Sequence, residues 1–440
     1  MSMDIPAYVG ACMEALEQAG FAAYAVGGCV RDALLGRTPH DFDLCTDARP
    51  EQTRAVFSGR QLVLAGEKHG TVGVVTPEGV VEITTFRQEG SYGDNRRPDW
   101  VDFITDLRED LARRDFTVNA MAFSPARGLA DPFGGRQDLE KKILRAVGDP
   151  DTRFQEDSLR ILRGVRFCAA YGLTPDPETE AAMLRQAHLM EHLARERVFE
   201  ELNRLLPKIN APQLIRFAPV LAAVIPELGP MIGFDQHSPH HAYDLYTHVA
   251  HVVEAVPGEP VLRWAALLHD IGKVPTFTRD ENGRGHFYGH AQTGETMAEA
   301  VLRRLKAPTA LREQAVELIG LHMTRLEPDK KRLRRTLNRL GTDTVLRLLD
   351  LQQADMGSKG TGTPEEMGQF SAVRELLAEI LAEDSCLSLK ELAVNGNDLM
   401  ALGYSGREIG RELDRLLGLV LEETLPNTRQ ALLAAAGKKQ

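Results

Sequence analysis

The spacing of apolar residues changes once along this chain, and that change constrains the fold more than any other feature. Up to about residue 145, short β-like runs at 21–26, 41–44, 71–75 and 80–86 alternate with turns rich in glycine and proline. From Phe154 onward, apolar residues recur at helical spacing almost to the end. We therefore predict an α+β head, with helices on a mixed sheet, followed by an all-α body.

Length and two loop-rich stretches suggest how the chain is divided. Its 440 residues suffice for about three domains, and the stretches 225–240 and 357–368 are rich in proline, glycine or threonine. We expect four parts, namely a catalytic head, a helical neck, a third helical domain and a helical tail, over 1–145, 146–235, 236–365 and 366–440.

Composition excludes some classes of protein and leaves others open. No apolar run approaches the roughly 18 residues that a membrane span needs, and residues 1–11 do not have the pattern of a secretory signal. The five cysteines are scattered and odd in number, which suits a reducing cytoplasm, so we expect a cytoplasmic protein. The net charge of −11 opposes phosphate binding, although basic residues cluster at 160–166 and 330–335. The second cluster is equally well explained as a solvated helix face.

A glycine turn and two acids form the first candidate site. Gly27 and Gly28 follow a predicted strand and precede a short predicted helix, so the backbone there can approach a triphosphate, with Arg31 adding a charged contact. Asp41 and Asp43 alternate with apolar residues, which puts both carboxylates on one face of a strand. Near a phosphate site such oxygen ligands favour Mg²⁺.

An exposed polar strand edge is the alternative for the two acids taken alone. A third carboxylate is usual in such sites, and Glu82, on the predicted strand 80–86, is our candidate. The spacing from Gly27 to Asp43 resembles the nucleotidyltransferase superfamily, which includes DNA polymerase β-like and antibiotic-modifying enzymes. Taken alone, that resemblance implies nucleotidyl transfer and nothing finer.

The segment 156–167 is a candidate for choosing the base. We predict one helix in which Asp157 and Arg160, three residues apart, share a face that Arg163 and Arg166 continue. A carboxylate beside a guanidinium matches the amino donor and ring-nitrogen acceptor of cytosine and adenine, but not guanine or uracil. The alternative is an ordinary surface ion pair between Asp157 and Arg160.

Six motifs occur in a fixed order over roughly the first 210 residues. They are Gly27–Asp32, Asp41 with Asp43, Arg113–Ala120, Asp131–Gly135 with Asp138–Leu139, Glu156–Arg160 and Glu196–Leu202. Together they resemble the ordered motifs of the class II tRNA nucleotidyltransferase and bacterial poly(A) polymerase family. The resemblance implies tRNA, CTP and ATP as partners, with metal on Asp41 and Asp43. It also implies nucleotide contacts from Gly28, Arg31, Arg114, Asp157, Arg160, Arg163 and Arg166.

The segment 89–100 distinguishes members of this family. Its glycines and charges indicate a mobile loop, similar to the flexible loop that members need to add the final A. Full addition of C, C and A is therefore our interpretation. Addition of A alone and poly(A) synthesis stay open, as does a passive surface loop.

A second candidate site lies in the helical body. Trp264–Lys273 is an apolar helix that ends in His269 and Asp270, and this order resembles the HD phosphohydrolase superfamily. The resemblance implies metal ligands, with Lys273 as a phosphate contact and a possible second metal position at His290 and His322. The implied ligands are His248, His269, Asp270 and Asp355. Imidazoles with carboxylates suit Mn²⁺, Ni²⁺, Co²⁺ or Fe better than Mg²⁺ alone.

The implied reaction of this site is hydrolysis of phosphomonoesters or 2′,3′-cyclic phosphates. The alternative is a vestigial domain that only holds tRNA. The tail at 387–436 is similar to the C-terminal segment of longer bacterial family members, where plain packing competes with a tRNA contact. Rival functions of other classes are a pure phosphohydrolase and a non-catalytic RNA-binding protein.

Overall fold

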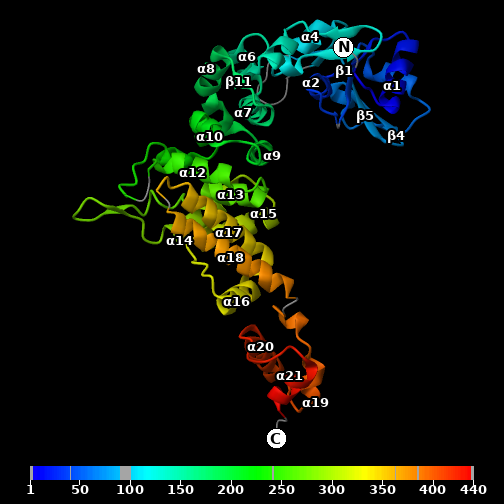
Figure 1. The fold of residues 1–440 in the computed structure, drawn as a ribbon. Helices are drawn as coiled ribbons and strands as arrows, with labels where there is room; N and C mark the ends of the chain where they lie inside the picture. The colour runs from blue at the N-terminus through cyan, green and yellow to red at the C-terminus, as the bar shows by residue number, and fades with distance from the viewer. Residues whose placement is uncertain are drawn as a thin grey trace. The chain divides into compact units, whose positions relative to one another are not determined.

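The computed structural model of the 440-residue chain describes residues 3–39, 41–89, 101–239, 242–361, 363–383 and 386–437. These residues form two compact units, Met1–Gly229 and Pro230–Gln440 (Figure 1). The predicted boundary at residue 235 falls close to this division, and the finer boundaries stay predictions. Among the described residues, no helix is both long and apolar enough to cross a membrane.

A seven-stranded mixed sheet forms the centre of the head, as predicted, in the order β3-β4-β5-β2-β1-β8-β9. Among the described strands of this sheet, β2 and β5 run parallel, and every other neighbouring pair is antiparallel. The strands are β1 (Ala23–Val26), β2 (Asp43–Thr46), β3 (Leu62–Val63), β4 (Thr71–Thr76), β5 (Gly79–Thr85), β8 (Ala122–Ser124) and β9 (Gly128–Ala130). The strands β6 (Arg87–Glu89) and β7 (Val101–Phe103), which follow β5 in the sequence, pair with each other as a separate antiparallel ribbon.

Short helices complete the head. They are α1 (Ala7–Gln18), α2 (Gly28–Leu34), α3 (Pro50–Val56), α4 (Leu107–Ala112) and α5 (Gly135–Glu140). On α1, Val9, Cys12, Met13 and Leu16 are buried, at the spacing of one helix face. They join a core to which β2 contributes Leu44. Because β2 alternates, the residues on either side of Leu44 face away from that core.

The neck is helical, as predicted, but the helix expected over 156–167 is broken. Glu156 ends α6 (Pro150–Glu156), and α7 begins at Leu159 (Leu159–Tyr171). Asp157 between them is extended, with φ −143° and ψ 101°, and its side chain accepts a hydrogen bond from the Leu159 amide at 3.1 Å. A carboxylate that satisfies a free amide at a helix start favours such a break. The remaining neck helices are α8 (Pro177–Arg185), α9 (Arg195–Leu205), α10 (Ala211–Arg216) and α11 (Ala218–Val224), with a small pair of strands, β10 (Ile143–Leu144) and β11 (Thr174–Pro175).

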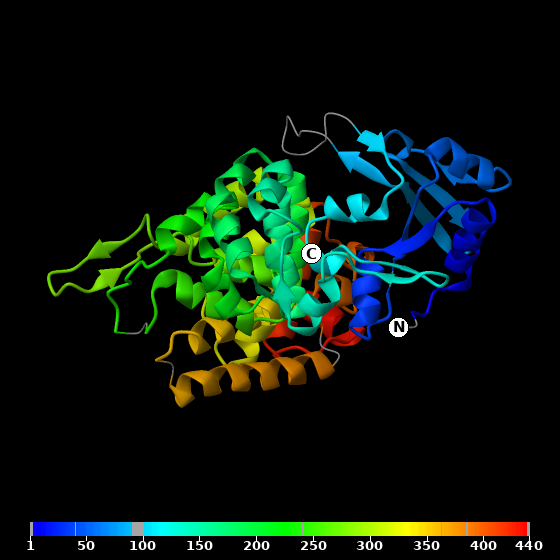
Figure 2. The ribbon, with the colours of Figure 1, turned by 90° about the horizontal axis from the view of Figure 1, so that it is seen from above.

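The second unit is built almost entirely from helices. They are α12 (Leu245–Ala255), α13 (Pro260–Leu268), α14 (His290–Arg304), α15 (Thr309–Leu321), α16 (Lys330–Leu340), α17 (Thr342–Gly357), α18 (Pro364–Ala382), α19 (Gly396–Ala401), α20 (Arg407–Leu421) and α21 (Arg429–Ala436). A hairpin of β12 (Thr278–Arg279) and β13 (Gly285–His286) projects away from the helices of this unit (Figure 2).

Helix α13 lies at the centre of the second unit. Every residue from Val261 to Leu268 is buried, and the helix packs against α12, α15 and α17. Apart from Arg263, these buried residues are apolar, and a helix that is apolar on nearly every side belongs in a core. The end of α13 lies inside this core, so the two polar residues that follow it, His269 and Asp270, are also buried. The tail helices α19, α20 and α21 share a separate core that includes Leu399, Leu416 and Leu432.

Candidate active sites

Strand pairing brings three acids and the glycine turn together in the head. In the parallel pair β2–β5, Asp43 lies opposite Glu82. In the antiparallel pair β1–β2, Asp43 lies opposite Val26, the residue before Gly27. Phe42 and Leu44 are buried, so Asp41 and Asp43 share the other face. The acids therefore lie beside the turn, as the alternation predicts, and Glu82 joins them.

The charges around Asp43 favour a cation. Desolvation by the surrounding chain and the nearby Glu82 carboxylate raise the pKa of Asp43, with a smaller contribution from Asp41, while Arg114 opposes the rise. A divalent ion would relieve the repulsion that disfavours the ionised form of Asp43. Oxygen donors alone fit Mg²⁺. Asp41, Asp43 and Glu82 are therefore the residues that could hold it.

Gly27 needs to be glycine for two reasons. Its φ of +78° is a left-handed conformation that side chains disfavour, and a Cβ there would lie 3.1 Å from Nη1 of Arg114. Arg114 thus packs against the turn, and its Nη2 lies 3.6 Å from Oδ2 of Asp110. This places a guanidinium beside both the turn and Asp43, where a triphosphate would need positive charge.

Arg31 is buried beneath the same turn and ties the head to the neck. Its Nη1 donates to Oδ1 of Asn119 at 2.6 Å, and its Nη2 donates to the hydroxyl of Tyr171 at the end of α7. The guanidinium also lies 4.1 Å from the centre of the Tyr171 ring. Asn119 and Tyr171 therefore fix the guanidinium of Arg31, the residue predicted to contact the triphosphate.

Asp115 extends this network to Arg163. It accepts from Nδ2 of Asn119 at 3.0 Å and from Nε and Nη2 of Arg163 at 2.9 and 2.6 Å. Burial raises the pKa of Asp115, but the Arg163 guanidinium and the hydrogen bonds from Asn119 and Arg163 outweigh it and lower the pKa to about 2. Arg163 is therefore bound to the head at neutral pH.

Asp157 and Arg160, the pair predicted to read the base, have different neighbours from those that the sequence predicts. Asp157 precedes α7, so the prediction that it shares a helix face with Arg160 was wrong. Its carboxylate faces Arg197 of α9, with Nη2 2.8 Å from Oδ2. Arg160 is held instead by Glu156 at 2.5 Å and by the carbonyls of Arg153 and Arg113. Each member of the pair thus has its own support.

Sequence reasoning missed several partners in this half. Arg166 faces Glu201 of α9 at 2.6 Å, and neither Glu201 nor Arg197 was a candidate. Both lie in the motif Glu196–Leu202, so the motif was the available signal. Tyr171 has no such signal. Residues 90–100 of the predicted A-addition loop lie outside the described residues.

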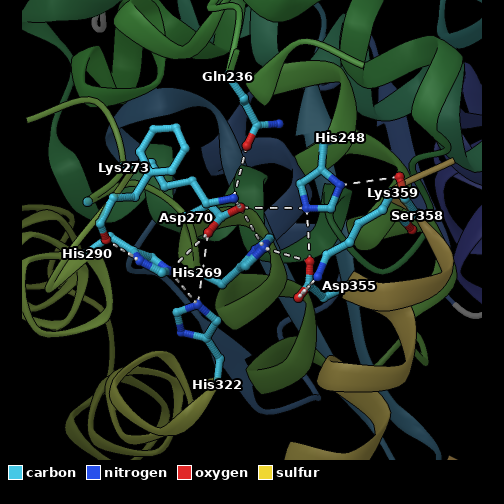
Figure 3. Close-up of polar contacts among 12 residues, drawn as sticks. Gln236, His248, His269, Asp270, Lys273, His290, His322, Asp355, Ser358 and Lys359 are labelled. Atoms are coloured by element: carbon cyan, nitrogen blue, oxygen red, sulfur yellow. Dashed lines mark hydrogen bonds and ion pairs between the residues drawn. The ribbon is translucent and has the colours of Figure 1, made fainter. Parts of the chain in front are cut away.

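The second unit contains a buried cluster of histidines and acids from five helices (Figure 3). His248 comes from α12 and Asp355 from α17, while His269 and Asp270 follow α13. His290 begins α14 and His322 follows α15. Residues separated by more than a hundred positions converge because α12, α15 and α17 pack against α13, and α14 packs against α15. The structure brings together all six predicted residues.

Each imidazole is held in the same way. The Nδ1 atoms lie within hydrogen-bond distance of backbone carbonyls, namely 3.2 Å for His248 to Ser358, 2.8 Å for His269 to Ala266, 2.9 Å for His290 to Phe287 and 2.6 Å for His322 to Ile319. A carbonyl only accepts, so each Nδ1 carries the hydrogen and each Nε2 presents a lone pair. Metal-binding histidines are typically oriented by such a carbonyl.

Asp270 divides its two oxygens between two pairs of histidines. Its Oδ2 lies 3.2 Å from Nε2 of His269 and 3.6 Å from Nε2 of His248. Its Oδ1 lies 3.7 Å from Nε2 of His290 and 3.9 Å from Nε2 of His322. Asp355 approaches the first pair, with Oδ1 3.0 Å from Nε2 of His248. A carboxylate shared in this way could bridge two metal ions.

The cluster's electrostatics favour ionised carboxylates, and they favour neutral imidazoles at His290 and His322, which are the metal-binding forms. At His269, burial lowers the pKa, but the Asp270 and Asp355 carboxylates outweigh it and raise the pKa above its usual value. Burial, reinforced by His269, lowers the pKa of His322 to about 4, and burial likewise lowers that of His290. Burial raises the pKa of Asp270, but His269 and Lys273 outweigh it and hold the pKa well below its usual value. Nitrogen and carboxylate donors together suit divalent transition metals.

Lys273 stands beside the cluster without belonging to the ligand set. Its Nζ lies 2.8 Å from Oδ2 of Asp270 and donates to Oε1 of Gln236 at 3.0 Å. Gln236, Ser358 and Lys359, whose Nζ lies 3.6 Å from Oδ2 of Asp355, were not predicted. A cavity of about 270 Å³ opens onto the cluster, and Lys273 and Lys359 both line it. A phosphate there would meet two cations.

Comparison with known proteins identifies relatives of this chain. Residues 23–145 match the Poly A polymerase head domain, residues 172–216 a probable RNA and SrmB-binding site of polymerase A, and residues 277–436 a putative tRNA nucleotidyltransferase domain 2. The CCA-adding enzyme of Bacillus velezensis is 33% identical over 416 residues, covering 94% of this chain and 93% of that enzyme.

Two further comparisons agree with the first. The CCA-adding enzyme of Geobacillus stearothermophilus is 44% identical over 210 residues, which cover 48% of this chain and 51% of that enzyme. The crystal structure of the Bacillus stearothermophilus CCA-adding enzyme in complex with CTP superposes with a TM-score of 0.70 at 30% identity, covering 97% of this chain and 95% of that one.

Proposed function

Because this chain belongs to the family of CCA-adding enzymes, we propose that it adds C, C and A to the 3′ end of tRNA from CTP and ATP, without a nucleic-acid template. The observation that carries the proposal is the convergence of Asp41, Asp43 and Glu82 beside the Gly27 turn. Three relatives that match 94%, 96% and 97% of this chain are CCA-adding enzymes. This favours full addition over the A-only and poly(A) alternatives.

In the reaction, the 3′-hydroxyl of tRNA attacks the α-phosphate of the nucleotide and pyrophosphate leaves. Mg²⁺ on the three carboxylates would supply charge neutralisation at the reacting oxygens. Gly28, Arg31 and Arg114 hold the triphosphate. Since Arg31 is fixed by Asn119 and Tyr171, it can orient the phosphates before reaction. Most of the acceleration comes from alignment and charge stabilisation.

Base choice falls to Asp157 and Arg160. The Asp157 carboxylate accepts from the exocyclic amino group of cytosine or adenine, and the Arg160 guanidinium donates to the adjacent ring nitrogen. Guanine and uracil present the reverse pattern and leave both groups unsatisfied. Arg197 and Glu156 keep the two side chains in place, with Arg163 and Arg166 as further nucleotide contacts.

The decisive experiment offers tRNA ending at the discriminator base, at C and at CC, with labelled CTP and ATP. Full addition predicts products longer by three, two and one nucleotides. Lengthening of only the tRNA that ends in CC would show an A-adding enzyme. A long adenosine ladder would show a poly(A) polymerase.

We also propose a second activity, hydrolysis of phosphomonoesters or 2′,3′-cyclic phosphates, in the buried cluster. Four imidazole nitrogens and two carboxylates converge there, and a cavity with two lysines adjoins them. His248, His269, Asp270 and Asp355 would hold one Mn²⁺, Ni²⁺, Co²⁺, Fe or Mg²⁺ ion, with His290 and His322 serving a second. The metal would supply an activated water, and Lys273 would bind the phosphate.

Two single variants separate the activities. Asp41→Ala should abolish nucleotide addition and leave phosphatase activity on a 2′,3′-cyclic nucleotide unchanged, whereas His269→Ala should do the reverse. Loss of both activities in either folded variant would contradict two independent sites. A vestigial cluster that only holds tRNA would give no hydrolysis in the parent chain, and metal analysis would then find no bound ion.

A further inference from the structure

The cavity at the metal cluster belongs to a longer groove within the second unit. It shares His322, Met323, Asp355 and Lys359 with a neighbouring cavity of about 300 Å³. That cavity in turn shares Arg325 and Leu326 with a third of about 360 Å³. The three cavities therefore adjoin one another between the cluster and α16, and together we call them the groove.

One end of the groove carries an exposed aromatic ring. Tyr288 lines the cavity at the cluster, and 78% of its surface is exposed. Its ring stacks on His286 with an interplanar angle of 5°, which fixes its orientation. A flat, oriented aromatic ring at the mouth of a cavity is a stacking surface for a nucleobase.

The other end is lined by one face of the basic helix α16. Arg332, Arg335 and Arg339 line the third cavity together with Arg325. On a different face, Lys330 and Arg334 are bound to Glu379, Glu383 and Glu423. The basic run therefore divides into a packed face and a groove face.

Two of the groove arginines have no acidic partner among the residues that the structure describes. Arg332 pairs with Glu327 and Arg335 with Glu422. No ion pair with another described residue is recorded for Arg325 or Arg339, and both are exposed. Two uncompensated guanidiniums in a groove are positioned to bind backbone phosphates.

We propose that the substrate of the cluster is the phosphorylated end of a single-stranded RNA, which lies along this groove. The proposal rests on the phosphohydrolase activity proposed above. The terminal phosphate lies between Lys273 and Lys359, the terminal base stacks on Tyr288, and neighbouring backbone phosphates reach Arg325 and Arg339. Water oxygen bonds to phosphorus, the bond from phosphorus to the ribose oxygen breaks, and the proton of water passes to that oxygen.

The length of the groove favours an RNA strand, and not a free nucleotide, as its ligand. Arg332 and Arg339 are seven positions apart on α16, which corresponds to about 10 Å along the helix. Arg325 lies between this face and the cluster, since it lines both the cavity at α16 and the middle cavity of the three. A mononucleotide bound at the cluster would leave these cations unused.

The experiment uses the full chain loaded with metal and two substrates, a short RNA oligonucleotide with a 3′-phosphate and the corresponding nucleoside 3′-phosphate. The variants are Tyr288→Leu and the double variant Arg325→Ser with Arg339→Ser. Lys331→Ser is the matched control, since Lys331 is exposed on α16 but does not line the groove.

We expect the double variant to raise KM for the oligonucleotide about tenfold and to weaken its dependence on salt, with the logarithmic slope smaller by about 1.4. Its KM for the mononucleotide and both kcat values should change less than about twofold. Tyr288→Leu should raise KM for both substrates, and Lys331→Ser should change neither.

Two outcomes would overturn the inference. Equal effects of the double variant on both substrates would show that the groove binds no strand. Hydrolysis of the mononucleotide but not of the oligonucleotide would also show that the groove binds no strand, and the proposed phosphohydrolase activity would still stand. If the parent chain hydrolyses neither substrate, the phosphohydrolase proposal itself fails.

Discussion

The Nε2 atoms of His290 and His322 lie 3.1 Å apart, although the Nδ1 atom of each ring is already directed at a backbone carbonyl. Both Nε2 atoms therefore present lone pairs to one another across a buried gap. Two acceptors at that distance repel unless a cation lies between them or beside them. The same pair faces Oδ1 of Asp270, and these three atoms are the donors that the proposed second metal position would use.

The metal content of the chain should follow from this arrangement. We expect two divalent ions per chain after loading with Mn²⁺, and one in His322→Ala, because the proposed site formed by His248, His269, Asp270 and Asp355 persists. His188→Ala, which alters an exposed histidine, should keep two. Mass-spectrometric metal analysis of the desalted proteins measures this, and two ions in His322→Ala would contradict the second position.

Glu82 should be required for nucleotide addition. Its position opposite Asp43 makes it a ligand or an immediate neighbour of one, so Glu82→Gln should lower the rate of CMP incorporation by about 10- to 100-fold and raise the Mg²⁺ concentration needed. Glu78→Gln, an exposed acid at the turn before β5, is the matched control. Equal rates for the two variants would remove Glu82 from the site.

Asp157→Ala should loosen base choice. Loss of the acceptor removes a discrimination of about 1–3 kcal/mol, so incorporation of GTP and UTP relative to CTP and ATP should rise by about tenfold or more. Arg197→Ala should act in the same direction to a smaller extent, because Arg197 orients the carboxylate. The readout is kcat/KM for all four nucleotides.

The control for this prediction is Asp151→Ala, which removes a partly exposed carboxylate of the same neck region that pairs with Arg185. It should leave base choice unchanged. Unaltered rejection of GTP and UTP by Asp157→Ala would refute the matching of a base edge by this carboxylate.

Asp115 should contribute stability that depends on pH. Its pKa in the folded chain is about 2, below the ordinary 3.8, so its contribution is complete above the unfolded pKa and is lost as pH falls toward 2. Asp115→Asn should therefore lower the free energy of unfolding by about 2 kcal/mol at pH 7. Denaturant unfolding at pH 7, 5 and 3 tests this, with equal losses expected at pH 7 and 5 and a smaller loss at pH 3. The same loss at all three values would contradict it.

Local patterns in the sequence determined a good part of the molecule. The alternation at 41–44 placed Asp41 and Asp43 on one face because side chains on a strand alternate. The apolar run before His269 predicted a buried helix, and with it a buried position for His269 and Asp270. The change of periodicity near residue 145 separated the mixed sheet from the helices, as the structure has them.

Tertiary structure alone decided the pairings between distant segments. No periodicity in β2 or β5 states that Asp43 lies opposite Glu82, since register depends on how the two strands pack. The break at Asp157 and its pairing with Arg197, forty residues away, were equally hidden. Hydrophobic spacing reports only which face of an element is buried. The partner that each polar group meets is set by how whole helices and strands pack, and that depends on the entire chain.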